Sequence, residues 1–357
     1  MRSQWPLQRL ATAGNLRAAR ALSHRSGPLQ SFLESQAVVV LDGGFGTAFG
    51  PDVQAHPLWG AQLLFTLDGH TKIEAAHRAF LEAGADVISS ASYQASFEMF
   101  QAADAFSSLP GGAITSEKFQ VRYSNDVLRT SVELAKKARY EFWKDQPASA
   151  RMRPLVAASV GPAGDNIVAW TGATDENTNV HDLPDEVISL YYERKLTALA
   201  RAKPDLVALE TLPGLREARL ALAALDKVAP ALPCWVSFIC RSDEATAAGD
   251  DFGAAAAELW EGHDSVHAVG LNCTSPAHVR GLLERARERA PSAVLLAYPN
   301  SGESWDAREG QRCWHEGMDA VLDGAHAVAM RDAGARVIGG CCRVTHGQIR
   351  EFREALL

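Results

Sequence analysis

The feature that most constrains the fold is a regular alternation that runs from about residue 37 to the end of the chain. Short apolar runs rich in β-branched residues alternate with longer segments that have helical periodicity. This alternation is typical of βα units whose strands form one parallel sheet. We predict eight strands, each followed by a helix, at residues 38–41, 86–89, 155–160, 206–209, 234–239, a run that ends at 273, 293–297 and 336–338.

Eight strand–helix pairs predict a single-domain α/β fold, a (β/α)8 TIM barrel at residues 37–357. Such barrels usually take ~250 residues and tolerate insertions. A doubly wound open sheet is the alternative. Active sites of these barrels lie at the carboxyl ends of the strands, and polar or special residues follow the predicted strands here. They are Asp42, Tyr93, Glu210, Cys273, Asn300, Cys341 and Cys342.

Two adjacent cysteines, Cys341 and Cys342, follow the last strand directly after Gly339 and Gly340. Neighbouring side chains on a strand point to opposite faces, so two adjacent thiolates can share one metal only where the chain turns. The two glycines permit that turn. Cys273 ends an earlier strand, and three thiolates would leave one position of a catalytic zinc ion open. Two buried thiols, or a disulfide between neighbours, are the alternatives.

The composition restricts the classes of partner. Of the 357 residues, 47% are hydrophobic and 22% charged, which indicates a globular protein with a full core. No run reaches the roughly 18 apolar residues that a spanning helix needs, so we expect no membrane partner. The net charge of -8 argues against nucleic acid. Six cysteines are too few for a disulfide scaffold, which favours a reducing compartment such as the cytoplasm.

The N-terminal segment differs from the rest. It is rich in arginine and serine and has no lysine or acidic residue before Glu34. This composition resembles a transit peptide, which would direct the protein to a mitochondrion or plastid. An unstructured extension on a cytoplasmic protein is the alternative. In both cases we expect residues 1–36 to lie outside the barrel, and a chain that begins near Ser35 to fold.

The chain resembles the homocysteine S-methyltransferase family, which includes betaine-using and S-methylmethionine-using enzymes. The resemblance covers residues 38–357 and depends on the order and spacing of seven segments. They are LDGGFGT at 41–47, GAD through YQAS at 84–96, VGP at 160–162, ETLP at 210–213, GLNCTSP at 270–276, YPNSGE at 298–303 and GGCCR at 339–343.

The resemblance implies a zinc ion, Zn2+, held by Cys273, Cys341 and Cys342, with the sulfur of homocysteine at the open position. A thiol on zinc is deprotonated at neutral pH and can attack the methyl group of an onium donor. The donor becomes neutral when it leaves, so it needs no acid. The product would be methionine, and the expected partners are homocysteine and a small onium donor.

The resemblance also implies residues that bind the substrates. Asp42 and Glu210 would bind the homocysteine ammonium group. The structural alternative is an ion pair at the barrel rim for Glu210 and a turn or helix cap for Asp42. Backbone amides near Gly43 and Gly44 would receive its carboxylate. Asn272 would orient the loop that carries Cys273, and Tyr93 would line the donor pocket. The implied substrate-binding residues are Asp42, Gly43, Gly44, Glu210, Asn272 and Tyr93.

One segment departs from the family pattern. After Gly161 and Pro162, members that use S-methylmethionine usually carry a Gly-Ser-Glu-Tyr segment, which the stretch Ala163–Val180 lacks. That segment is expected near the donor. The resemblance as a whole implies S-methylmethionine as the donor, with S-adenosylmethionine as a substitute, while this departure leaves betaine as the alternative. The departure also motivates a hypothesis from another class, a zinc-binding barrel that acts as a sensor or scaffold without catalysis.

Overall fold

The computed structural model describes residues 25–107, 109, 112–146, 151–164, 183–302, 305–306, 313–314 and 322–357. Eight parallel strands form one sheet in the order β1-β10-β7-β6-β5-β4-β3-β2. Their positions agree with the eight predicted runs. The strands are β1 Val39–Val40, β2 Val87–Ser89, β3 Leu155–Val160, β4 Leu206–Leu212, β5 Cys234–Phe238, β6 Val266–Asn272, β7 Leu295–Tyr298 and β10 Ala335–Ile338.

The two end strands of this order, β1 and β2, meet and close the sheet. A parallel bridge joins Leu41 to Val87. The Asp86 amide donates to the Val40 carbonyl (2.7 Å), and the Asp42 amide donates to the Val87 carbonyl (3.0 Å). A closed sheet has no exposed strand edge. The predicted barrel is confirmed, and the open sheet is excluded.

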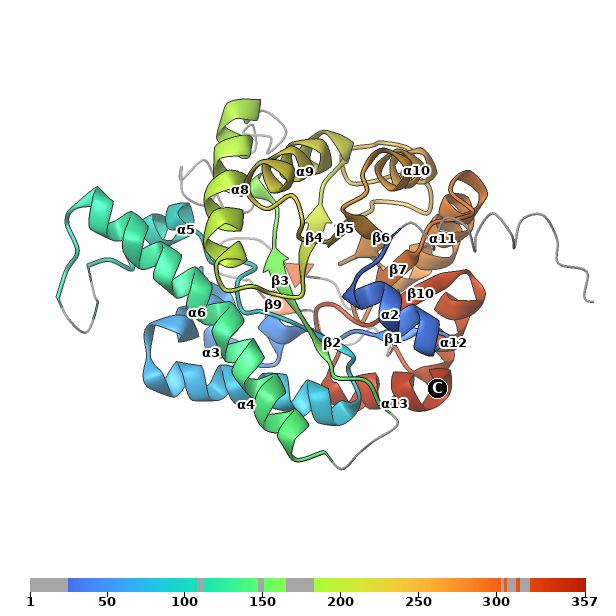
Figure 1. Ribbon diagram of the computed structural model, residues 1–357, viewed down its shortest axis with the longest axis horizontal. Coiled ribbons are helices and arrows are strands. Elements are labelled where there is room, and N and C mark those ends of the chain that lie inside the picture. The colour runs from blue at the N-terminus through green and yellow to red at the C-terminus, as the bar shows by residue number, and fades with distance from the viewer. Residues whose placement is uncertain are drawn as a thin grey trace, which may run out of the picture.

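The helices surround the barrel, as Figure 1 shows. The helices that follow the strands pack apolar faces on the sheet, so the strands are buried on both sides. The helices are α2 Pro28–Ser35, α3 Pro51–Ala55, α4 Leu67–Ala83, α5 Phe97–Ala102, α6 Glu117–Lys144, α8 Asp185–Ala200, α9 Leu215–Val228, α10 Phe252–Gly262, α11 Pro276–Arg289, α12 Gly324–Asp332 and α13 His346–Leu356, with 3-10 turns η1 Phe45–Thr47 and η2 Trp59–Phe65.

Local signals set the ends of α4. The Thr66 hydroxyl accepts a hydrogen bond from the Gly69 amide (3.0 Å), which caps the first turn. Gly84, at φ 110°, ends the helix in the left-handed conformation that glycine adopts at low cost. Residues 67–72 are mostly polar and carry little apolar periodicity, so the Thr66 cap marks the start of the helix more clearly than the hydrophobic pattern does.

The prediction that the whole N-terminal segment lies outside the fold is wrong for helix α2. Leu29 and Phe32 on this helix are each 1% exposed and belong to the core. Just before the helix, Arg25 donates to the carbonyl of Val266, the first residue of β6 (2.7 Å). The helix therefore covers the end of the barrel from which the strands begin. An eight-residue helix was missed because its apolar face spans only two turns.

Residues 1–24 lie outside the described part of the chain, so the transit peptide stays a prediction. Within the described part, no helix combines the length and hydropathy needed to cross a membrane. A short antiparallel pair, β8 (Trp305–Asp306) and β9 (Cys313–Trp314), stands between β7 and α12 in the sequence. This pair was not predicted, since the stretch reads as a charged loop.

Candidate active site

A cavity of about 320 Å³ lies where the strands end. Parallel strands that form a barrel bring their carboxyl ends to one rim, so residues three hundred positions apart meet there. The cavity lining includes every residue predicted for the site. These are Asp42, Gly43, Gly44, Tyr93, Glu210, Asn272, Cys273, Cys341 and Cys342.

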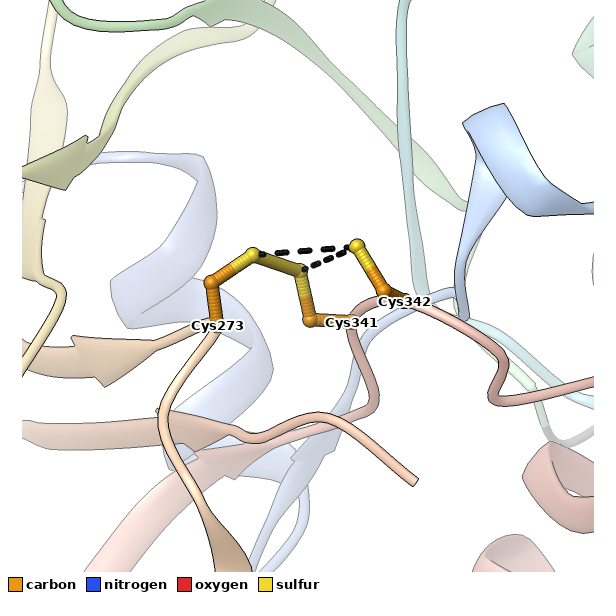
Figure 2. A group of neighbouring side chains, drawn as sticks. All are labelled: Cys273, Cys341 and Cys342. Carbon is orange, nitrogen blue, oxygen red and sulfur yellow. Dashed lines mark hydrogen bonds between the residues drawn. A yellow bond between two sulfur atoms is a disulfide. The ribbon is translucent and has the colours of Figure 1, made fainter. Parts of the chain in front are cut away.

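The three cysteine sulfurs converge at one side of this cavity, as Figure 2 shows. The Cys342 sulfur lies 4.0 Å from that of Cys273 and 3.9 Å from that of Cys341. Cys273 and Cys341 are joined as a disulfide. The three sulfurs lie within 4.8 Å of one another, which is the spacing of a group that could hold a metal ion.

The three cysteine sulfurs fit the ligand positions of a tetrahedral metal ion when the thiols are reduced. Sulfur ligands about 2.3 Å from a zinc ion would lie about 3.8 Å from one another. The two separations that involve Cys342 agree with that value. Cys273 and Cys341 could act as ligands only as thiolates, so the disulfide form and the metal-binding form are alternatives. Burial raises the pKa of the Cys342 thiol to about 12, a cost that a bound cation would offset.

The cysteine loop, residues 339–343 after β10, is held between the ends of the neighbouring strands β1 and β7. The Gly340 amide donates to the Asp42 carbonyl (3.2 Å), and the Cys341 amide donates to the Pro299 carbonyl (2.7 Å). A Cβ atom at Gly339 would lie 2.6 Å from the Cβ of Leu41. Glycine is therefore required there for close packing against the end of β1.

The turn that follows differs from the prediction. We expected Gly339 and Gly340 to supply an unusual backbone conformation, yet the left-handed residue is Arg343, at φ 67°. A side chain at Gly340 would collide with that of Val344. Both glycines are thus needed for space. Cys273 itself is left-handed, at φ 49°, and so leaves β6 at the rim.

The Asp42 carboxylate faces the cavity and is 5% exposed. It accepts hydrogen bonds from the Ser89 amide (2.7 Å) and the Ser89 hydroxyl (3.2 Å). Burial, together with the nearby charge of Glu210, raises the pKa of Asp42 to about 7. A cation bound beside Asp42 would favour its ionised form.

Glu210 is the second carboxylate of the cavity and is 8% exposed. It accepts hydrogen bonds from the Ser159 hydroxyl and, at 3.0 Å, from the Tyr298 hydroxyl. Burial raises its pKa. No described cationic group lies within 4.0 Å of Asp42 or Glu210, although the charge of the buried Lys195 acts to lower the pKa of Glu210. The described chain therefore shows no ion pair at the rim for these residues. Both carboxylates face the same cavity.

Gly43 and Gly44, which follow β1, lie where any side chain would collide with the neighbouring loop. The Gly44 amide already donates to the Val344 carbonyl (2.9 Å), so it does not have the free N–H that carboxylate binding was predicted to use. A Cβ atom at Gly44 would lie 2.6 Å from the Cys341 carbonyl oxygen, and one at Gly43 would collide with Val344. Both glycines let the β1 loop pack against the cysteine loop.

Two further predicted residues lie at the wall of the cavity. Tyr93 is half-buried, and its ring lies so near Gly161 that a Cβ atom there would be 2.8 Å from the ring. Asn272 is 1% exposed at the end of β6. The departing segment Ala163–Val180 is described only as far as Gly164, so its relation to the cavity lies outside the described residues.

Several lining residues were not predicted. Phe45 and Trp59 add aromatic surface from the 3-10 turns after β1, where the sequence has no periodic signal. Ser159 and Tyr298 hold Glu210 from β3 and β7. Tyr298 directly precedes the Pro-Asn turn after its strand, a position at the barrel rim that could have identified it.

Comparisons with known proteins agree with this site. A model of the family described as homocysteine S-methyltransferase matches residues 39–356. Homocysteine S-methyltransferase 1 of Zea mays is 35% identical over 328 residues, which cover 89% of this chain and 94% of that protein. The metallated form of the homocysteine methyltransferase MmuM from Escherichia coli superposes with a TM-score of 0.72 at 29% identity, over 92% of this chain and 99% of that one. Its oxidized form gives a TM-score of 0.73 over the same shares.

Proposed function

Since the chain belongs to the homocysteine S-methyltransferase family and is an enzyme of that activity, we propose that it uses zinc and a sulfonium methyl donor. S-methylmethionine is the expected donor, and methionine is the product. The methyl–sulfur bond of the donor breaks while a bond forms between that methyl carbon and the homocysteine sulfur. The donor leaves as a neutral thioether, and the thiol proton of homocysteine is released to water.

Cys273, Cys341 and Cys342 would hold the zinc ion. The observation that supports this role is the convergence of three sulfurs within 4.8 Å at the barrel rim. When bound, zinc would keep the homocysteine thiol ionised at neutral pH, which removes the need for a general base. The chain's own task is then to bring the two substrates together in line.

Asp42 and Glu210 would bind the ammonium group of homocysteine. The two carboxylates face one cavity whose described lining holds no cationic side chain, and the buried Lys195 acts on Glu210 only from outside that lining, which favours a cationic ligand there. Ser89, Ser159 and Tyr298 donate hydrogen bonds to these carboxylates and fix their directions. Carboxylates held in fixed directions would bind homocysteine in one orientation.

The rest of the lining suits a sulfonium donor. Phe45, Trp59 and Tyr93 line the cavity, and aromatic faces attract cations. Among the described lining residues there is no lysine, arginine or histidine. S-methylmethionine, S-adenosylmethionine and betaine each carry a carboxylate as well as an onium centre, so the aromatic lining supports an onium donor and the assay below identifies which one.

The test is methionine formation by purified, reduced, zinc-loaded protein with homocysteine and, in separate reactions, S-methylmethionine, S-adenosylmethionine or betaine. We expect the highest kcat/KM with S-methylmethionine. Turnover with betaine alone would overturn the donor assignment. Full zinc occupancy without turnover on any of the three donors would instead favour the sensor or scaffold hypothesis.

A further inference from the structure

The Asn272 side chain uses all of its hydrogen-bonding groups on the protein. Its Oδ1 atom accepts from the Thr211 amide (2.7 Å) and from the Ser237 hydroxyl (2.8 Å). Its Nδ2 atom donates to the Thr211 hydroxyl (2.7 Å) and lies 3.9 Å from the Cys341 sulfur. An amide has two N–H donors and one carbonyl acceptor, so none remains for a substrate. The Thr211 amide can only donate, which fixes the atom that faces it as oxygen.

Thr211 has an unusual backbone. Its φ is 61°, a left-handed value that is a genuine outlier for a β-branched residue. The register between β4 and β5 shifts here, since Leu209 pairs with Val236 while Leu212 pairs with Phe238. Three steps along β4 thus face two along β5, which is a bulge with one extra residue.

The bulge has two consequences for the site. The Thr211 amide donates to the Asn272 side chain, so this side chain takes the place of a partner on the neighbouring strand. Glu210 and Thr211 both line the cavity, although consecutive residues on a regular strand point to opposite faces. The left-handed conformation at Thr211 is therefore what lets both residues face the cavity.

We propose that Asn272 and Thr211 form a positioning pair, in which the Asn272 amide holds Thr211 left-handed and so directs the Glu210 carboxylate at the substrate. This role depends on the proposed function, since it concerns the ammonium group of homocysteine. It assigns Asn272 to the support of Glu210, with no contact to the substrate. Strain held by the surrounding structure at a binding site is a known way to preorganise a ligand contact.

Three substitutions at Thr211 separate this role from a direct contact. Thr211→Val keeps the β-branched shape but removes the acceptor for Asn272, so we expect the KM for homocysteine to rise about tenfold at full zinc content. Thr211→Ser keeps the hydroxyl and should behave like the wild type. Thr211→Gly removes the whole side chain, yet glycine adopts the left-handed conformation freely. Its KM should therefore stay within about threefold of wild type.

The rank order of the KM values for homocysteine shows whether Thr211 acts through Glu210 or contacts the substrate. A hydroxyl that touched the substrate would make Thr211→Gly at least as poor as Thr211→Val, and that result would overturn the proposal. The matched control is Thr130→Val on α6, whose hydroxyl donates to the Asp126 carbonyl one turn earlier in the same helix (2.9 Å). A loss in melting temperature with an unchanged KM in Thr211→Val would also overturn it.

Two further measurements keep the test independent of folding and of the reaction. In a Glu210→Gln background, Thr211→Val should add little to the loss of homocysteine affinity, because it acts through Glu210. A crystal structure of Thr211→Val requires no substrate and should show Glu210 displaced from Ser159 and Tyr298. An unmoved Glu210 would contradict the proposal. Failure of the wild type to turn over homocysteine would contradict the proposed function and leave this structural readout valid.

Discussion

At the scale of single residues, the protonation of Asp42 sets a pH limit on substrate binding. Burial and the charge of Glu210 raise the pKa of Asp42 to about 7, so the carboxyl becomes neutral as the pH falls below that value. A neutral carboxyl attracts the homocysteine ammonium group less strongly. We expect kcat/KM for homocysteine to fall on the acid side of about pH 7, a profile that reports on the free enzyme.

A second variant checks the cause of this acid limb. Glu210→Gln removes the negative charge that helps to raise the pKa of Asp42. The midpoint of the limb should therefore move to lower pH, while the KM at pH 8 rises because one carboxylate is lost. A midpoint that stays fixed in Glu210→Gln would show that another group titrates.

The sequence predicted the cysteines and the two acids because each follows a recognisable strand. The link between Asn272 and Thr211 could not be predicted in this way. A left-handed threonine has no signature in the sequence, and Ser237, which completes the bond to Asn272, looks like any small residue on a buried strand. The resemblance to a family located these positions without showing how they act.

At the scale of single elements, helix α2 contributes to the core. Phe32 is 1% exposed, and its replacement by alanine should reduce the free energy of unfolding by about 3–5 kcal/mol. Urea unfolding followed by circular dichroism measures this loss. The matched control is Phe119→Ala, since Phe119 is 57% exposed and its loss should change stability by less than about 0.5 kcal/mol.

The same helix revises an expectation from the sequence. A chain that begins near Ser35 lacks Leu29 and Phe32, so we expect it to unfold more readily than one that begins at Arg25. Equal stability of the two chains would contradict the role given to α2. The longer helices were predicted because their periodicity extends over many turns, whereas two turns of an apolar face give too little signal.

At the scale of the whole molecule, the barrel closes around one buried carboxylate. Asp86 is fully buried beside the junction of β1 and β2. It accepts hydrogen bonds from the Val40 amide (3.0 Å) and from the Gln36 side chain (2.7 Å). Its other oxygen accepts from Arg353 on the last helix (2.7 Å). One side chain thus joins the start, the closing seam and the end of the chain.

Removal of that carboxylate should destabilise the whole domain. In Asp86→Ala the partly buried Arg353 and Arg151 would both lose their carboxylate partner, and the loss of one partner from a buried ion pair costs about 3–5 kcal/mol. The midpoint of urea unfolding should fall in a single transition, because the seam belongs to one cooperative unit. The control is Asp68→Ala, which removes an exposed pair with Lys72 and should have almost no effect. Comparable midpoints for the two variants would contradict this account.

The most direct test of the central claim measures zinc content and methionine formation on the same samples of reduced protein. We predict about one zinc per chain in the wild type and the loss of both zinc and activity in Cys341→Ser. Cys240→Ser, which alters a buried cysteine outside the cluster, should keep both. Full zinc occupancy together with full activity in Cys341→Ser would contradict the account.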